Sequence, residues 1–242
     1  MKLLVISLVL AAAYASSHDR SPDIIPIDGG VKGDGISTLY WDCCSPSCAS
    51  DRVIQTKNKI PVQTCQKDGI TPSRKEDNTK SGCMKGGTAY PCTNQSPYLV
   101  NETLAFGFSA SSFHGGAETS HCCLCVLLSF KDHLAGKQML VQLINTGSDL
   151  GHNHFDLAIP GGGVGLFNMG CTYQWGAPVN GWGERYGGVT SIEECDELPD
   201  VLQEGCRFRF TFLEGDDNPA LSFYQVKCPA ELIDISKCGD RD

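Results

Sequence analysis

Residues 37–48 of the chain read STLYWDCCSPSC. The run over 38–44 is rich in β-branched, apolar and aromatic side chains, which is typical of a β-strand. Asp42 stands between an aromatic pair and two adjacent cysteines, and a third cysteine follows at position 48. The stretch therefore predicts a strand whose end is held by covalent cross-links.

The 242 residues include 14 cysteines, all of them between Cys43 and Cys238. In an oxidising compartment an even set indicates disulfides, whereas in the cytosol it indicates metal or redox chemistry. The segment His121-Cys122-Cys123-x-Cys125 is the candidate for a zinc site. It lacks the paired Cys-x-x-Cys knuckles of most structural zinc sites, so disulfides are favoured, although spacing alone does not decide their pairing.

The first 15 residues have the pattern of a secretory signal peptide. Lys2 gives a positive start, residues 3–13 are apolar apart from Ser7, and Ala13-Tyr14-Ala15 is a small-x-small cleavage signal. The alternative, a membrane anchor, needs about 20 apolar residues to cross the hydrocarbon core of a bilayer. We therefore expect a secreted, extracellular protein with no membrane association and with disulfide-bonded cysteines.

Charge and composition narrow the class of protein further. The chain has 19 Lys and Arg against 28 Asp and Glu, a formal net charge of −9. A nucleic-acid-binding protein needs a basic footprint to replace counterions, so we expect no nucleic-acid partner. A hydrophobic content of 41% supports a real core, and 27 glycines with 12 prolines indicate a turn-rich, β-leaning fold. We expect a monomer.

Apolar runs of strand length dominate the second half of the chain. The predicted strands, in addition to 38–44, are 104–110, 123–130, 138–145, 155–159, 208–212 (where Phe208, Phe210 and Phe212 alternate with polar residues) and 221–226. One clear helix is predicted over 192–198, where Ser191 and Glu194 have capping-box spacing and Pro199 ends the helix. Such a series favours a mostly β, small closed barrel.

The remaining segments are predicted to be irregular. Residues 16–36 form an extended lead-in, residues 45–104 form long cysteine-linked loops with room for one short helix, and residues 37–242 form a single domain. Asn94 and Asn101 begin acceptor sequons for N-glycosylation.

Two carboxylates are the strongest candidates for chemistry. Asp42 is held between aromatics and cross-links, and Asp156 begins an apolar strand that can desolvate its carboxyl and raise its pKa. Asp149 lies seven residues earlier in a glycine-flanked loop, and its negative charge would raise the pKa of Asp156 further. Two carboxyl groups flanking a glycosidic bond are the minimum equipment of a glycosidase.

Other residues allow weaker interpretations. His152 and His154 share a strand face and could bind metal, but a hydrogen-bonding role near Asp156 is favoured. The glycine-dense segment 161–165 lacks the lysine of a phosphate loop and is read as a tight turn. Three tryptophans could stack on sugar rings or be structural, with neither reading favoured; they are Trp41, Trp175 and Trp182.

Several of these segments together resemble glycoside hydrolase family 45, secreted endo-β-1,4-glucanases of fungi and plant-feeding invertebrates. The matching segments are Ser37 to Cys48; Lys80-Ser81-Gly82-Cys83 with Gly86-Gly87-x-Ala89-Tyr90-x-Cys92; Gly147 to Gly165, which contains His154-Phe155-Asp156; Arg185-Tyr186-Gly187-Gly188; and Ala220 to Glu231. The resemblance runs from about Ser37 to Cys238, and the 14 cysteines occur in the family's order.

The resemblance implies a fold and a mechanism. The fold would be a six-stranded double-psi β-barrel with long disulfide-linked loops, few short helices and a long open groove. An inverting mechanism would use Asp42 as general base and Asp156 as general acid, with assistance from Asp149. Candidate substrate-binding residues are Tyr40, Trp41, Ala110 and His154. This chemistry requires no metal and no organic cofactor.

The resemblance also implies a disulfide pairing, which the spacing did not decide. The pairs would be Cys43 with Cys171, Cys44 with Cys83, Cys48 with Cys122, Cys65 with Cys92, Cys123 with Cys238, Cys125 with Cys228, and Cys195 with Cys206.

Two departures from the family pattern bear on the substrate. Leu39 stands where the family usually has arginine, and Ser50 stands where it often has tryptophan. The expected partner is a β-1,4-glucan such as cellulose, with xyloglucan as an alternative. A non-hydrolytic, expansin-like glucan-binding protein is the other alternative, but such proteins lack the base carboxylate, so Asp42 favours the enzyme. A duplicated family member with low activity is a third alternative, which both departures permit.

Overall fold

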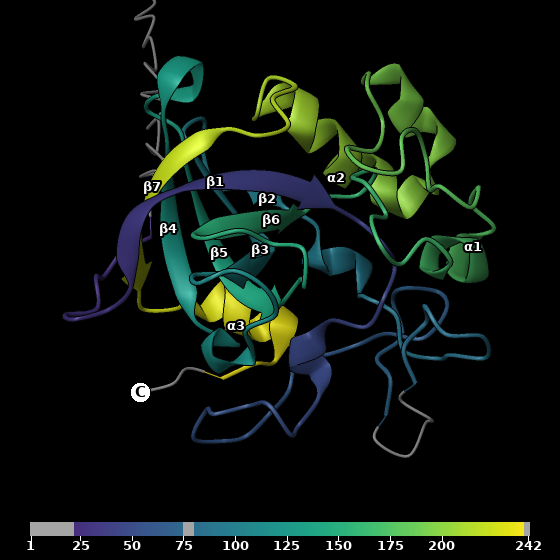
Figure 1. Ribbon diagram of the computed structural model, residues 1–242, viewed down its shortest axis with the longest axis horizontal. Helices are drawn as coiled ribbons and strands as arrows, with labels where there is room; N and C mark the ends of the chain where they lie inside the picture. Colours follow the sequence, from purple (N-terminus) through teal and green to yellow (C-terminus); the bar gives the residue numbers. More distant parts are fainter. Residues whose placement is uncertain (1–21, 75–79, 240–242) are drawn as a thin grey trace, which may run out of the picture.

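The computed structural model describes residues 22–74 and 80–239 (Figure 1). The predicted signal peptide, residues 1–15, lies outside the described residues. No helix in the described segments is long and apolar enough to cross a membrane.

Six strands of the described chain close into a barrel. They are β1 (Lys32–Tyr40), β3 (Leu104–Ser112), β4 (Cys125–Phe130), β5 (Gln138–Asn145), β6 (His154–Ala158) and β7 (Ala220–Val226). Their order is β3-β5-β4-β7-β1-β6, and β6 pairs back onto β3 to close the sheet. The pairs β1–β6 and β3–β5 are parallel, and the other four are antiparallel. A short strand, β2 (Tyr98–Leu99), adds to β3. The predicted six-stranded double-psi β-barrel is confirmed.

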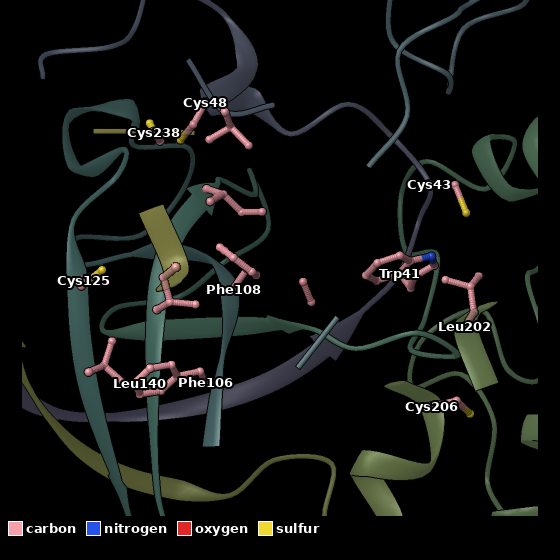
Figure 2. Packing of buried hydrophobic residues seen from close by; sticks show 14 of the residues in the cluster. Trp41, Cys43, Cys48, Phe106, Phe108, Cys125, Leu140, Leu202, Cys206 and Cys238 are labelled. Carbon is pink, nitrogen blue, oxygen red and sulfur yellow. The ribbon is translucent and has the colours of Figure 1, made fainter. Parts of the chain in front are cut away.

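Side chains on each strand alternate between two apolar clusters. On β4, for example, Leu127 belongs to one cluster, while Val126 and Leu128 belong to the other. This is the period of two that a pleated strand imposes, and both faces of the sheet are covered. Figure 2 shows the first cluster, in which Phe106, Phe108 and Leu140 lie on the barrel and Trp41 lies toward Leu202. The apolar cluster of the barrel therefore extends to Trp41, the residue before Asp42.

Strand β1 differs from the predicted run over 38–44 at both ends. It begins at Lys32, inside the predicted lead-in, because residues 32–36 pair with β7. It ends at Tyr40, after which the Trp41 amide donates to the carbonyl of Gly163. The prediction missed the start because the glycines and aspartate of this segment are typical of a loop. As a result, Asp42 lies just beyond the strand and not within it.

The described chain contains three α-helices and several short 3-10 turns. The helices are α1 (Gly170–Trp175), α2 (Asp200–Thr211) and α3 (Ala230–Ser236), and the turns are η1 (Ser47–Ala49), η2 (Thr93–Gln95), η3 (Thr119–His121), η4 (Asp132–Leu134) and η5 (Glu193–Glu197). Figure 1 places α1 and α2 on the side of the barrel toward which β1 runs.

The strand predicted over 208–212 was wrong, because residues 208–211 are the end of α2 and Phe212 is its C-cap. Phe208 and Phe212 stack with ring centroids 5.1 Å apart, as expected for side chains four residues apart on a helix. Pro199 precedes the helix and Asp200 is in its first turn, which are both helix-starting signals. Alternation over five residues was too short to distinguish a strand from a helix whose face is apolar.

The helix predicted over 192–198 is only the 3-10 turn η5, and its capping box does not form. The carboxylate of Glu194 accepts hydrogen bonds from the amide and hydroxyl of Thr190 and not from the Ser191 segment. Pro199 comes after this turn but directly before α2. Pro199 was therefore interpreted as the end of one helix, whereas it marks the start of α2.

All 14 cysteines lie in the described residues and form seven disulfides, with the same pairing as the resemblance implies. The pairs are Cys43–Cys171, Cys44–Cys83, Cys48–Cys122, Cys65–Cys92, Cys123–Cys238, Cys125–Cys228 and Cys195–Cys206. The candidate zinc segment 121–125 is therefore cross-linked through each of its cysteines and has no thiolate to offer.

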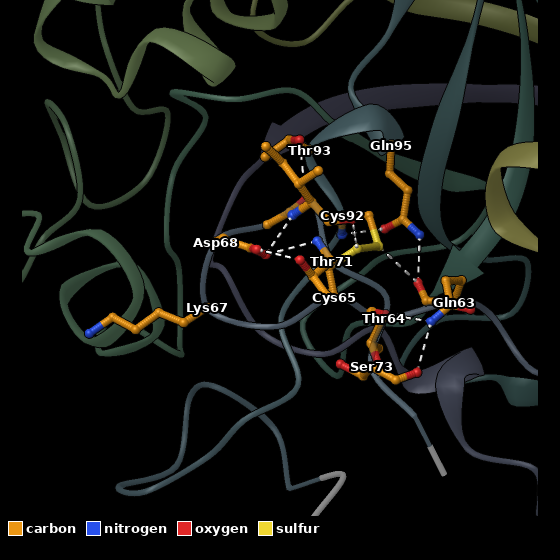
Figure 3. Close-up of a disulfide and its surroundings, with 12 residues drawn as sticks. Gln63, Thr64, Cys65, Lys67, Asp68, Thr71, Ser73, Cys92, Thr93 and Gln95 are labelled. Carbon is orange, nitrogen blue, oxygen red and sulfur yellow. Dashed lines mark hydrogen bonds between the residues drawn. A yellow bond between two sulfur atoms is a disulfide. The ribbon is translucent and has the colours of Figure 1, made fainter. Parts of the chain in front are cut away.

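The long loops between β1 and β3 are stabilised by such cross-links together with buried amides. Figure 3 shows the Cys65–Cys92 disulfide and its surroundings. The Gln95 amide donates to the carbonyl of Gln63 at 2.8 Å, and the Gln63 amide donates to Thr64 and Ser73 carbonyls. These bonds add to the isolated β-bridges that Cys65 makes with Pro72 and Tyr90.

Candidate active site

An open groove with a volume of about 470 Å³ contains both candidate carboxylates. Its lining comes from the end of β1, the disulfide loop at Cys83, the end of β3 at Ala110, the loop after β5, and the glycine segment 163–165 with Leu166 and Phe167. Asp42, Asp149 and Asp156 all line it. The structure therefore brings together the three acids that the sequence singled out.

Asp42 is fixed by its backbone and by two neighbouring disulfides. Its carboxylate accepts a hydrogen bond from the amide of Cys44 at 2.9 Å. Cys43 has a positive φ of 59°, a sharp turn that its bond to Cys171 secures. Burial raises the pKa of Asp42 to about 6, although the Cys44 amide acts in the opposite direction.

Asp156 is positioned by strand register. It lies beside Thr38 in the parallel β1–β6 pair and beside Ala110 in the antiparallel β3–β6 pair. The Thr38 hydroxyl donates to its carboxylate at 2.6 Å. Burial raises the pKa of Asp156 to about 7, the Thr38 bond lowers it, and the charges of Asp149 and Asp42 raise it. Burial and the neighbouring negative charges therefore both favour the protonated form of this carboxyl.

His154 lies behind this pair and does not line the groove. Its Nδ1 accepts from the amide of Gly151 at 3.2 Å, so in the neutral ring the proton is on Nε2, which lies 2.8 Å from the Thr38 hydroxyl. Burial lowers the pKa of His154, which favours this neutral form. Since the Thr38 hydroxyl has a single proton, it accepts from His154 and donates to Asp156. The structure therefore brings His154 to the acid through Thr38, instead of to the groove surface.

The other predicted substrate-binding residues divide into two groups. Tyr40 and Ala110 line the groove. Trp41 does not line it, because it is 3% exposed and packs in the apolar cluster, which favours the structural interpretation of this tryptophan over sugar stacking. Trp182 is also buried, and with the half-buried Trp175 it borders a separate cleft.

The remaining predicted residues lie outside the groove lining. His152 and Asn94 are exposed, and the Asn101 side chain accepts hydrogen bonds from the amides of Thr103 and Leu104. Leu39 is 5% exposed and belongs to the core, and Ser50 is exposed.

Sequence reasoning missed Thr38 and Asn145. Thr38 and Tyr40 are alternate residues of β1 and so share one face of the strand that leads to Asp42, and this signal could have identified Thr38. The Asn145 amide donates to the Tyr40 hydroxyl at 3.2 Å. It comes from the far end of β5, so no local pattern indicates it.

Two half-buried carboxyl groups with raised pKa values line one groove on a disulfide-linked β-barrel, an arrangement that fits a glycoside hydrolase. The sequence model of Glycosyl hydrolase family 45 matches residues 34–239, and the chain belongs to this family. It is a glycoside hydrolase of the cellulase type.

The sequences of similar proteins match this chain over most of its length. An endoglucanase of Phaedon cochleariae is 51% identical over 244 residues, covering 99% of this chain and all of the relative. An endoglucanase of Cryptopygus antarcticus is 47% identical over 218 residues, covering 89% of this chain and 93% of the relative. The crystal structure of the cellulase from that Antarctic springtail superposes with a TM-score of 0.79 at 47% identity, covering 86% of this chain and 97% of that one.

Proposed function

We propose that this enzyme is a secreted endo-β-1,4-glucanase that hydrolyses internal bonds of cellulose or a related β-glucan with inversion. Asp42 is the general base and Asp156 is the general acid. The observation that carries the proposal is that both carboxyl groups line one groove, where burial raises the pKa of each, to about 6 for Asp42 and about 7 for Asp156. The negative charges of Asp149 and Asp42 raise the pKa of Asp156 further and favour its protonated form, as a general acid requires.

The reaction balances with these two groups and one water. Asp42 accepts a proton from the water, whose oxygen bonds to the anomeric carbon from the side opposite the leaving group. Asp156 gives its proton to the glycosidic oxygen as the bond from that oxygen to the anomeric carbon breaks. Asp42 ends protonated and Asp156 ends ionised, and proton exchange with solvent restores both. Asp149 assists, because its charge raises the pKa of Asp156 and helps to retain the proton until it is needed.

Secretion is part of the proposal. The seven disulfides support it, because such a set persists in oxidising compartments. Residues 1–15 would be the signal peptide and residues 37–242 the catalytic domain, acting as a monomer on the polysaccharide.

The experiment is a product assay on a panel of β-glucans. Purified enzyme is incubated with carboxymethylcellulose, swollen cellulose, xyloglucan, glucomannan and mixed-linkage glucan, and new reducing ends are counted. Proton NMR of the first products is expected to show the α-anomer, because inversion converts a β-linkage to an α reducing end. First appearance of the β-anomer would exclude inversion. Binding without new reducing ends would support the expansin-like alternative, and faster cleavage of xyloglucan than of cellulose would support the xyloglucan alternative.

The pH dependence of kcat/KM tests the two roles and the Thr38 hydrogen bond. We expect a bell-shaped profile with an acidic limb at about 6 from Asp42 and an alkaline limb at about 7 from Asp156. In Thr38→Val the carboxylate of Asp156 loses a donor, so its pKa should rise and the alkaline limb should move up by about one unit.

Thr38→Ser is the matched control, because it keeps the hydroxyl and should leave the alkaline limb in place. The acidic limb should stay near its wild-type position in both variants. An alkaline limb that is the same in Thr38→Val as in the wild type would contradict either the hydrogen bond or the assignment of that limb to Asp156.

A further inference from the structure

We propose that Asn145 is a positioning residue that turns the phenol proton of Tyr40 into the groove, so that Tyr40 donates a hydrogen bond to a sugar oxygen at the cleavage point. The inference rests on the proposed function and adds to it a residue outside the two carboxylates. Tyr40 lines the groove together with Asp42 and Asp156, so a donor at this place faces the reacting part of the substrate.

The first step is that a backbone amide decides the orientation of the Asn145 side chain. The amide of Ser47 lies 2.9 Å from Asn145 Oδ1. A backbone N–H only donates, so the atom that faces it must be the carbonyl oxygen of the side-chain amide. The nitrogen, Nδ2, is thereby directed to the other partner, the hydroxyl oxygen of Tyr40, at 3.2 Å.

The second step is that this nitrogen decides the direction of the phenol proton. An amide NH₂ group has no acceptor, so the Tyr40 oxygen accepts and its single O–H points away from Asn145. Burial, followed by the charge of Asp42, raises the pKa of Tyr40, so the phenol stays neutral and keeps this proton. Within residues 22–74 and 80–239 the structure gives the Tyr40 oxygen no other hydrogen bond. The proton is therefore available to the substrate.

Two elements, β5 and η1, hold the Asn145 side chain and its partner Ser47 in place. Asn145 ends β5, beside Ala110, where the β3–β5 register shifts between Ser109 and Ala110. Such an irregularity re-aims the side chains next to it. Ser47 begins the turn η1, which the adjacent Cys48–Cys122 disulfide ties down. The Thr146 hydroxyl also donates to the Ser47 hydroxyl at 3.2 Å.

The test is a double-mutant cycle between Asn145→Asp and Tyr40→Phe. Asn145→Asp is isosteric, but the carboxylate accepts from both Ser47 and Tyr40, so the phenol proton turns away from the groove. We expect it to lower kcat/KM on β-glucan by about tenfold, and Tyr40→Phe to do the same, because each removes one hydrogen bond to the substrate. In the Tyr40→Phe background, Asn145→Asp should then cost less than about threefold, because no proton is left to redirect.

The new negative charge of Asn145→Asp needs its own control. It raises the pKa values of Asp42 and Asp156 in both backgrounds, so kcat/KM is compared at the maximum of each pH profile, with melting temperatures measured for every variant. Asn145→Ala keeps the phenol free to rotate toward substrate and is expected to lose less activity than Asn145→Asp.

An equal cost of Asn145→Asp with and without the Tyr40 hydroxyl would overturn the inference, as would full activity of Tyr40→Phe. Failure of the proposed function would look different, because hydrolysis would then survive the replacement of Asp156.

Discussion

Asp156→Asn is expected to lower kcat on β-glucan by about 10²- to 10⁴-fold, the usual contribution of a positioned general acid or base. The amide keeps the shape of the side chain and can still accept the Thr38 hydrogen bond, but it has no proton to give to the glycosidic oxygen. Asp42→Asn should cause a comparable loss, because the attacking water then has no base. Both rates are measured as new reducing ends from soluble β-glucan.

The leaving group distinguishes the two roles. A dinitrophenolate leaves without protonation, so Asp156→Asn should recover much of its rate on a dinitrophenyl cello-oligosaccharide, while Asp42→Asn should stay slow on the same compound. The opposite pattern would exchange the two assignments. Equal recovery in both variants would mean that neither residue acts as proposed.

Stability provides the control for Asp156→Asn. The pKa of this carboxyl rises from 3.8 in the unfolded chain to about 7 in the folded protein, so the folded state binds the proton more tightly. Its contribution to the free energy of unfolding is fully present below pH 3.8 and is lost as the pH rises through about 7. Asparagine does not ionise, so at pH 8 the variant should be more stable than the wild type by on the order of 1–4 kcal/mol. A stabilised but inactive protein shows that the activity was not lost by unfolding.

The sequence was most informative about features that depend on residues close together in the chain. The run over 138–145 is the strand β5 with the predicted bounds, because it is apolar, long enough and bounded by turn residues. Asp42 and Asp156 could be singled out as candidates from their apolar and cross-linked surroundings together with the family resemblance, and both line one groove. In contrast, the alternation of Phe208, Phe210 and Phe212 misled, because only packing against the barrel decides between strand and helix over so short a run.

The parts of the site that were missed depend on contacts between distant segments. Thr38 reaches Asp156 only through the β1–β6 register, a separation of 118 residues. Asn145 reaches Tyr40 across 105 residues. A single sequence carries no register, so hydrogen-bond partners of this kind become visible only when the barrel is closed.

Removing the Cys43–Cys171 disulfide should produce the largest loss of stability among the cross-links next to the site. The two residues are 128 apart, but the Cys48–Cys122 disulfide shortens the path, leaving five residues from Cys43 to Cys48 and 49 from Cys122 to Cys171. Closing a loop of that length is worth about 4 kcal/mol in the chain-entropy model. The double variant Cys43→Ala and Cys171→Ala is therefore expected to lower the free energy of unfolding by roughly that amount, as measured by guanidinium denaturation.

The same variant should also lose activity while it is still folded, since Cys43 follows Asp42 directly and the bond holds a left-handed turn at that point. We expect kcat at a temperature well below melting to fall by about tenfold, because small displacements of a catalytic group are costly. The matched control is Cys195→Ala with Cys206→Ala, which opens a loop of 11 residues and removes no bond beside a groove carboxylate. It should cost about 3 kcal/mol of stability and leave kcat near the wild-type value. If both double variants lose activity only in proportion to their unfolded fraction, the Cys43–Cys171 bond stabilises the barrel without positioning the base.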